Sequence, residues 1–203
     1  MNATTFENFE KLPKEKQQAI IRAGILCFGQ HGYEKASISQ IAKMAGISKA
    51  AVFVYFGTKK DLFLYLIQYV RKEIEALFIE GTEDYFETME RYIRTQFQIM
   101  QKHPGMYEFM RLPEKPIESE DFEAIEQFIR EHTENAVNSV FAHIDWTKFR
   151  DDLDRTTILN LTNWVGAGYI AQSEKTLQSD GAFMEIARYL AILKTALYKA
   201  EYL

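Results

Sequence analysis

The sequence has little of what secreted, disulfide-bonded or membrane-embedded proteins need. Its 203 residues include one cysteine, Cys27, which excludes an internal disulfide framework. No apolar run approaches the roughly 18 residues of a membrane-spanning helix. The opening segment Met1–Glu10 is acidic and polar, whereas a signal peptide needs a basic end and an apolar core. We therefore expect a cytoplasmic protein with no membrane partner.

Motifs for catalysis and for metal binding are equally scarce. None of the four histidines stands in a His-Glu-x-x-His or Glu-x-x-His arrangement, so zinc-protease and di-iron sites lack support. The stretch Gly166–Ala171 matches the letters of the dinucleotide fingerprint. That fingerprint needs a preceding strand within a βαβ unit, and small residues that let helices pack closely explain the stretch better. We expect no enzyme, no metal ion and no cofactor.

The composition is that of a globular protein, with 47% apolar and 26% charged residues, but the charge is divided unevenly. Residues 1–60 carry nine Lys or Arg and four Asp or Glu, a net charge of +5, so the rest carries −10 of the total of −5. A basic N-terminal part fits a module that binds a polyanion, and an acidic remainder avoids the same polyanion. The alternative is an uneven surface charge without a function.

Apolar residues recur at helical spacing throughout, and no segment alternates cleanly with period two. This pattern predicts an all-α fold of about nine helices. The expected helices cover about residues 13–32, 37–45, 48–56, 58–78, 86–100, 106–112, 122–143, 155–175 and 182–200. Between the helices, residues 145–154 are expected to be a connection anchored by Trp146 and Phe149.

The segment 37–56 has the anatomy of a helix-turn-helix at the end of a three-helix N-terminal head. Ser37 and Gln40 form a predicted capping box. In this motif the serine side chain accepts from a free N–H group of the helix start, and the glutamine side chain reaches back to the N–H of the serine. Gly46 supplies the turn, because a left-handed backbone conformation suits glycine. Ser48 and Thr58 are predicted to cap the two helices that follow. The predicted inner positions of the helix 48–56 are Val52, Phe53 and Phe56.

Three stretches of this region carry a family resemblance. They are Ile20-Ile21-x-Ala23-Gly24-x-x-Cys27-Phe28-x-x-x-Gly32-Tyr33, Ile41-Ala42-x-x-Ala45-Gly46-Ile47-Ser48 and Phe53-x-Tyr55-Phe56-x-x-Lys59-x-x-Leu62. Together they resemble the signature of the TetR/AcrR family of bacterial transcriptional regulators over roughly residues 18–63. The chain departs from the family pattern at Ala50, where many members have glycine, and at Phe53, where tyrosine is frequent. Beyond Phe63 only helix count and length agree.

The resemblance implies a transcriptional regulator, commonly a repressor, that binds a double-stranded DNA operator. It implies a DNA-binding domain over residues 1–60, with the helix 48–56 in the major groove and neighbouring helix N-termini on phosphates. The expected DNA-binding residues are Ser37, Gln40, Ser48, Lys49, Ala50, Ala51, Tyr55, Thr58, Lys59 and Lys60. Helix capping, simple packing and a solvated turn are the alternative roles of these side chains.

The resemblance also implies a homodimer, because two heads must meet the two halves of a palindromic site. In the family, the last two helices form the dimer interface, which corresponds here to about 155–175 and 182–200. The residues expected to bury against the partner are Leu190, Leu193, Leu197 and Tyr198. The alternative is that these side chains pack inside one subunit.

The third implication is a sensor for a small apolar or amphipathic effector in residues 61–203, whose middle helices are rich in Phe, Tyr and Met. Flexible methionine with aromatic walls suits such a ligand. The expected ligand-binding residues are Phe97, Met100, Tyr107, Met110, Phe128, His132, Asn163 and Trp164. A filled core is the alternative for these residues. The rival function is a helix-turn-helix DNA-binding protein without a small-molecule ligand.

Overall fold

The computed structural model describes residues 6–77, 82–110, 121, 123–131, 141–172 and 180–203. Within these ranges the chain forms α-helices and short 3-10 helices, and no β-strand is found among them. The prediction of an all-α fold is confirmed. The chain divides into two compact units, one of Met1–Glu75 with Ile99–Ala136 and one of Ala76–Gln98 with Val137–Leu203. Helices α5 and α6 contribute residues to both units.

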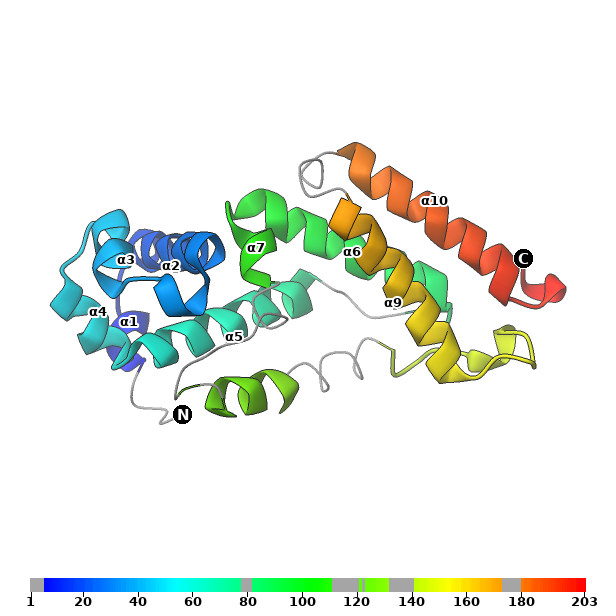
Figure 1. Cartoon of the computed structure of the whole chain (residues 1–203), viewed down its shortest axis with the longest axis horizontal. Helices are drawn as coiled ribbons and strands as arrows, with labels where there is room; N and C mark the ends of the chain where they lie inside the picture. The colour runs from blue at the N-terminus through cyan, green and yellow to red at the C-terminus, as the bar shows by residue number, and fades with distance from the viewer. Residues whose placement is uncertain (1–5, 78–81, 111–120, 122, 132–140, 173–179) are drawn as a thin grey trace. The chain divides into compact units, whose positions relative to one another are not determined.

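The first unit is built around the N-terminal helices (Figure 1). The helices up to residue 110 are α1 Glu7–Glu10, α2 Lys14–Lys35, α3 Ile38–Ala45, α4 Lys49–Phe56, α5 Lys59–Leu77, α6 Tyr85–Lys102 and α7 Met106–Met110, and most of α6 belongs to the second unit. Residues 123–131 are also helical. Each helix expected from periodicity over residues 13–112 is present, with ends displaced by a few residues. Helix α1 is present but was not expected, because its four residues are too few to show a helical period.

Two glycines determine where the helices of the helix-turn-helix turn. Gly46 ends α3 in the left-handed conformation at φ +68°, and the Ile47 N–H donates back to the Ala42 carbonyl at 3.0 Å. Gly32 also has a positive φ, +73°, but ψ is 172°. The regular helix is therefore interrupted at Gly32, as predicted, but a further turn beyond the kink runs on to Lys35.

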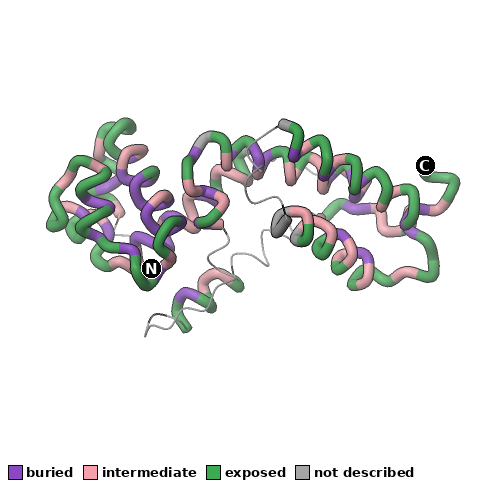
Figure 2. The backbone as a smooth tube through the Cα atoms, turned by 45° about the horizontal axis from the view of Figure 1, so that its top comes forward, coloured by how far each residue is buried: buried purple, intermediate pink, exposed green. Residues whose placement is uncertain are grey.

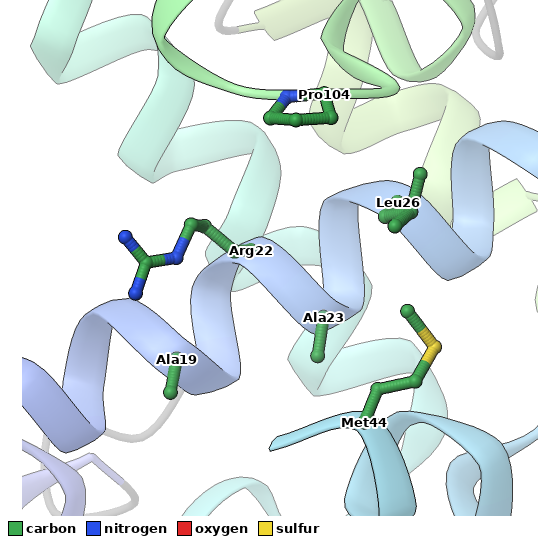
Figure 3. Close-up of a pocket in the computed structure, with 6 residues that line it drawn as sticks. All are labelled: Ala19, Arg22, Ala23, Leu26, Met44 and Pro104. Atoms are coloured by element: carbon green, nitrogen blue, oxygen red, sulfur yellow. The ribbon is translucent and has the colours of Figure 1, made fainter.

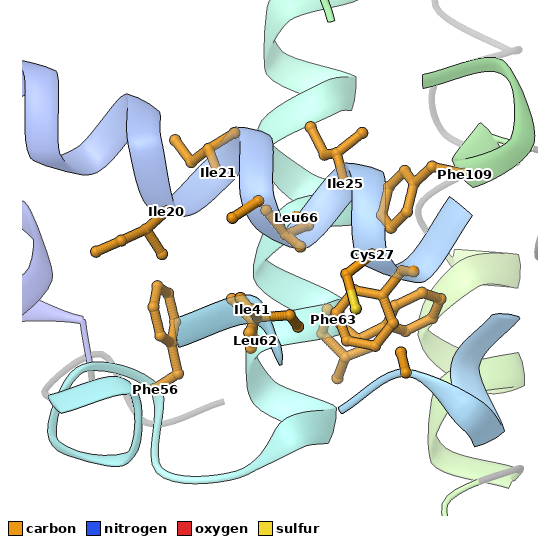
Figure 4. Close-up of a cluster of buried hydrophobic side chains, with 14 of the residues drawn as sticks. Ile20, Ile21, Ile25, Cys27, Ile41, Phe56, Leu62, Phe63, Leu66 and Phe109 are labelled. Carbon is orange, nitrogen blue, oxygen red and sulfur yellow. The ribbon is translucent and has the colours of Figure 1, made fainter. Parts of the chain in front are cut away.

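The core of the first unit joins α2, α3, α4, α5 and α7 (Figure 4). Phe56 and Phe63 are fully buried, and the ring of Phe63 packs edge-on against Phe109 of α7 at 5.6 Å. Phe9 of α1 is also fully buried, with its ring 4.8 Å from that of Phe56. Gln17 joins α1 to α2, because its Nε2 donates to backbone carbonyls of residues 10 and 12. The head thus has one continuous apolar core, and α4 packs against it through the buried side chains of Val52 and Phe56.

The second unit contains α9 Arg155–Gln172, α10 Asp180–Leu197, and 3-10 helices at Trp146–Lys148 and Ala200–Tyr202. The hydroxyl of Tyr85, at the start of α6, shares a hydrogen bond of 2.7 Å with the hydroxyl of Thr162 of α9. Phe149 is 3% exposed, and its ring stacks with Trp146 at 5.6 Å. The predicted anchoring of the connection 145–154 by these two aromatic residues is confirmed.

The expectation that four residues of this region bury against a partner is wrong for three of them, while Leu193 is only partly buried in the single chain. Leu190, Leu197 and Tyr198 are 6%, 6% and 2% exposed within the single chain, so they pack inside one subunit. Along α9 and α10, exposed and buried residues alternate at the spacing of helical turns (Figure 2). The large apolar side chains left exposed there are Trp164, Met184, Tyr189 and Ile192. Hydrophobic periodicity identified both helices but not which of their apolar positions face inward.

Candidate nucleic-acid interface

Helix α4 presents a largely apolar outer face. Val52 and Phe56 are buried, as predicted, but the predicted inner position of Phe53 is wrong, since its side chain is 42% exposed. Val54 is 61% exposed. Residue 53 follows Lys49 by four positions, so the two share one side of the helix, and the Lys49 ammonium lies 5.9 Å from the Phe53 ring centroid. That i,i+4 spacing was the signal in the sequence that Phe53 points outward.

Tyr55 occupies an intermediate position. Its side chain is half-buried and packs against the core, with its ring 6.4 Å from Phe9 of α1. Ala50 is exposed, and Ala51 is partly exposed. Ser48 caps α4 as predicted, because its Oγ accepts a hydrogen bond from the Ala51 N–H at 3.1 Å.

The start of α3 differs from the predicted capping box. Ser37 is exposed and precedes the helix in an extended conformation, but its side chain makes no capping hydrogen bond. Its carbonyl instead accepts from the Gln40 and Ile41 N–H groups, both at 3.0 Å. The Gln40 side chain reaches the His31 ring on α2, 3.1 Å between Nε2 atoms. The Gln40 side chain, which the capping-box pattern paired with Ser37, is therefore bound by His31 of α2 instead.

The start of α5 carries the second predicted cap. The Asp61 N–H donates to Thr58 Oγ1 at 3.0 Å, and that hydroxyl donates to Asp61 Oδ2 at 2.7 Å. Lys59 Nζ donates to the Glu34 carbonyl at 2.9 Å and lies 4.7 Å from the Tyr33 ring centroid. The predicted cap at Thr58 is confirmed, and Lys59 holds the start of α5 against the last turn of α2.

Lys60 is held by a carboxylate that comes from far along the chain. Its ammonium pairs with Asp121 Oδ1 at 3.1 Å, and Asp121 Oδ2 accepts from the Tyr33 hydroxyl at 2.5 Å. The hydrogen bond from Tyr33, followed by Lys60, lowers the pKa of Asp121. Burial and then the bond to Asp121 raise the pKa of the Tyr33 hydroxyl. This cluster joins residue 121, just ahead of the helical residues 123–131, to the head.

The residues expected to bind DNA therefore lie in one unit, on α3, α4 and the start of α5. Ser37, Gln40, Ser48, Lys49, Ala50 and Thr58 are exposed. The exposed face of an eight-residue helix beside two helix N-termini can approach a duplex groove while free N–H groups meet phosphates.

The residues expected to bind a ligand are divided between the two units. Met100, Tyr107, Met110 and Phe128 belong to the first unit, whereas Phe97, Asn163 and Trp164 belong to the second. His132 lies outside the described residues. Phe97 is 6% exposed with its ring 6.0 Å from Phe183, while Trp164 is 67% exposed.

A cavity of about 290 Å³ lies in the first unit instead, and none of the eight expected ligand-binding residues lines it (Figure 3). It lies along α2, with Met44 of α3 on one side and Pro104, which follows α6, on the other. Its lining residues are Ala19, Arg22, Ala23, Leu26, Met44 and Pro104.

In the part of the chain that the structure describes, no group of three or more His, Cys, Asp or Glu side chains is placed to hold a metal ion. Of the helices described, none has both the length and the apolar character needed to cross a bilayer.

Comparison with known proteins identifies the head. Residues 20–66 match the family model described as bacterial regulatory proteins, tetR family. Over 54 residues the chain is 39% identical to the HTH-type transcriptional repressor AcnR of Corynebacterium glutamicum. This match covers 27% of the present chain and 29% of AcnR. Over 75 residues it is 35% identical to the fatty acid metabolism regulator protein of Bacillus subtilis, 37% of this chain and 36% of the relative. The matches to these relatives thus span about a third of their length.

The likeness in fold extends over nearly the whole chain. A TetR family transcriptional regulator from Chloroflexus aurantiacus superposes with a TM-score of 0.61 at 23% identity, covering 95% of this chain and 98% of that one. The matched head, with its capped α4 and left-handed Gly46, and the all-α fold of the remainder agree with each other. Residues 20–66 therefore carry the N-terminal part of the tetR family of bacterial regulatory proteins, and the fold of the chain is like that of a solved TetR family regulator.

Proposed function

We propose that the protein is a DNA-binding transcriptional regulator, acting as a repressor, that binds a palindromic operator as a homodimer. The observation that carries the proposal is the exposed face of α4, held from behind by a buried core and flanked by capped helix starts. This is the arrangement in which a recognition helix enters the major groove. The family match over residues 20–66 supports it.

Within this proposal, the DNA-binding domain is residues 1–60 and each candidate side chain has a physical role. Lys49 is the cation on the outer face of α4. Ala50, Ala51 and Tyr55 contribute to the surface that meets the groove, and Ser48 orients α4 as its cap. The other phosphate contacts come from the starts of α3 and α5, at Ser37, Gln40, Thr58, Lys59 and Lys60. Positioning on the duplex through phosphates requires no base reading.

Dimerisation is assigned to α9 and α10 of the region 61–203. Trp164, Met184 and Ile192 are 67%, 70% and 54% exposed in the single chain, which is an unusual number of large apolar side chains for two neighbouring helices. Apolar and aromatic residues of this kind are enriched in the centre of protein interfaces. A cytoplasmic location follows from the DNA partner.

The effector is the finer part of the proposal. A relative that is 35% identical over 75 residues is named as a fatty acid metabolism regulator, and the middle helices are rich in aromatic residues and methionine. Both support a small apolar or amphipathic effector that contacts residues among Phe97, Met100, Tyr107, Met110, Phe128, His132, Asn163 and Trp164. If no compound changes operator affinity, the chain is a helix-turn-helix DNA-binding protein without a small-molecule ligand.

The DNA-binding proposal is tested by selecting bound duplexes from a random pool with the full chain and then measuring affinity for the selected site. Lys49→Ala should weaken binding about 5- to 150-fold if the lysine contacts a base, since one good base contact contributes ~1–3 kcal/mol. If it contacts phosphate, the dependence of log affinity on log salt should instead become shallower by about 0.9.

The matched control is Lys72→Ala. Lys72 is an exposed lysine on α5, and at 1.5 Å per residue it stands roughly 20 Å along the helix from Lys59. Its removal changes the net charge by the same amount and should leave specific binding nearly unchanged. Equal effects of the two substitutions, or no enriched sequence after selection, would contradict the proposed function.

A further inference from the structure

The outer face of α4 offers few hydrogen bonds and much apolar surface. Ala50, Phe53 and Val54 are its exposed carbon-only side chains, with Phe53 42% and Val54 61% exposed. Residues 50, 53 and 54 follow the i, i+3, i+4 spacing of one helix face. The face is therefore a continuous apolar strip one side chain wide.

The polar groups near this strip are mostly engaged elsewhere. Ser48 Oγ accepts the capping bond from Ala51. Tyr55 is half-buried, with its ring against Phe9. Lys49 contributes a charged group to the outer face, and its ammonium lies 5.9 Å from the centre of the Phe53 ring. A helix with this composition gains little from the donors and acceptors of base edges.

The major groove contains one apolar group that varies with sequence, the 5-methyl of thymine. Placing Phe53 or Val54 against the amino group of cytosine or the carbonyl of guanine would remove water from a polar atom and give it no partner, which is costly. Placing the same side chains against a thymine methyl buries carbon on carbon. The chemistry of the strip thus discriminates thymine from the other bases.

We propose that Phe53 and Val54 are specificity-determining residues that read the 5-methyl groups of thymines in the operator, with Lys49 supplying the polar contact beside them. The inference rests on the proposed function, because it requires α4 to enter the major groove. It specifies the chemical class of the site: half-sites with thymine at the positions that face residues 53 and 54.

The test uses the operator selected with the full chain, resynthesised with deoxyuridine in place of one thymidine at a time. Deoxyuridine keeps the base pair and removes the methyl group. At a contacted position, affinity should fall about fourfold, which corresponds to ~0.8 kcal/mol for burying one CH₂-sized group. Thymidines outside the protected site should show no change and serve as the control for altered duplex stiffness.

Side-chain variants assign each methyl to its reader. With Val54→Ala, the deoxyuridine penalty should disappear at the position that Val54 contacts and persist at the position that Phe53 contacts. With Phe53→Leu, the deoxyuridine penalty should become smaller at the position that Phe53 contacts and persist at the position that Val54 contacts. Val54→Thr, which keeps one methyl group at nearly the same volume, should retain part of the penalty. Lys49→Ala should lower affinity for thymidine and deoxyuridine operators by the same factor. All three positions are exposed on the head, and thermal unfolding verifies that each variant remains folded.

The outcomes separate the inference from the proposed function. If no sequence is enriched and no footprint forms, the proposed function fails. If a specific operator is bound but every deoxyuridine substitution changes affinity less than twofold, the regulator stands and the thymine-methyl inference is overturned. A penalty that remains the same in the Val54→Ala and Phe53→Leu variants also overturns it, because another side chain then reads the methyl group.

Discussion

Gly29 is a position where a single missing methyl group allows two segments to approach. A Cβ built on Gly29 would lie 2.6 Å from the backbone carbonyl oxygen of Gly105, which is far inside van der Waals contact. A Cβ on Gly24, five residues earlier in α2, would come equally close to Leu66, but to a methyl end of that side chain. The first clash involves backbone and the second a flexible group.

Gly29→Ala should therefore destabilise the protein by about 1–3 kcal/mol, the usual cost of overpacking a rigid site. Gly24→Ala should cost less, because the Leu66 side chain can turn and alanine is the better helix former by ~1 kcal/mol. Urea unfolding, with the slope compared between variants, measures both. Equal destabilisation by the two substitutions would show that the turn at Gly105 yields as readily as a leucine side chain does.

Single residues also show what local sequence patterns can and cannot predict. Ser48 and Ser37 both precede helices, and the sequence predicts a cap at each. Ser48 makes its capping bond, whereas Ser37 does not, and Gln40 turns to His31 instead. His31 is nine residues away on another helix, so only the folded structure brings it within reach. Local chemistry predicts which bonds are available, and tertiary neighbours decide among them.

The docking of the helical residues 123–131 on the head depends on Asp121. Its carboxylate accepts from the Tyr33 hydroxyl and pairs with Lys60, and its backbone carbonyl accepts from the Ile125 N–H at 3.0 Å. The hydrogen bond from Tyr33, followed by the pair with Lys60, lowers the pKa of the Asp121 carboxyl from the ordinary 3.8. A carboxyl whose pKa is lower in the folded state stabilises the fold above its ordinary pKa, and the contribution is lost as pH falls through the lowered value.

Asp121→Asn should lower the free energy of unfolding at neutral pH by up to ~1 kcal/mol, since the pair is about a third exposed and screened by solvent. The difference from wild type should vanish in acid below the lowered pKa. Because Asp121 partly neutralises Lys60 in the wild type, the variant should also strengthen the phosphate contact proposed for Lys60 and steepen the salt dependence of DNA binding by up to about 0.9. Thermal unfolding against pH and binding against salt measure the two effects.

The matched control is Glu123→Gln, which removes one exposed negative charge from the same helical segment. It should leave both the pH dependence and the salt dependence close to wild type. If Asp121→Asn and Glu123→Gln behave alike, the effect is one of net charge and not of the contacts with Tyr33 and Lys60.

The helices themselves were largely predictable, because most of them bury one face and show it as a period of 3.6 residues. The short helix α1 was not, since four residues form no period and its stability comes from Phe9 and Gln17 packing against other helices. In α4, apolar residues occupy both faces, so periodicity assigned Phe53 to the wrong side. A helix that uses carbon on its outer surface cannot be oriented by hydrophobicity alone.

At the level of the whole molecule, the sequence separated a basic head from an acidic remainder, while the partition of the middle helices followed from contacts. Met100 and Phe128 pack against the core of the first unit, although they were grouped with Phe97 of the second. The boundary at residue 60, the effector residues and the dimer stay predictions, because each depends on contacts with a ligand, with DNA or with another chain.

The dimer is the assembly that the proposed operator requires, since two heads must meet half-sites about 34–36 Å apart. Met184 and Ile192 are eight residues apart on α10, hence on one face, and are 70% and 54% exposed. Wild type should sediment at about twice the 23.7 kDa of one chain. The double variant Met184→Glu/Ile192→Glu should move toward one chain, because paired carboxylates lose hydration in an apolar interface.

Loss of the dimer should weaken operator binding by about a hundredfold or more, the usual gain from joining two binding modules, while binding to unrelated DNA changes far less. Leu203→Glu, at an apolar residue that is 63% exposed but lies outside α9 and α10, is the matched control and should keep both dimer and affinity. A wild-type protein that sediments as one chain yet binds a palindromic site would contradict the paired-head assembly. A double variant that stays dimeric would instead place the contact on other residues, because a carboxylate pair cannot be buried there without cost.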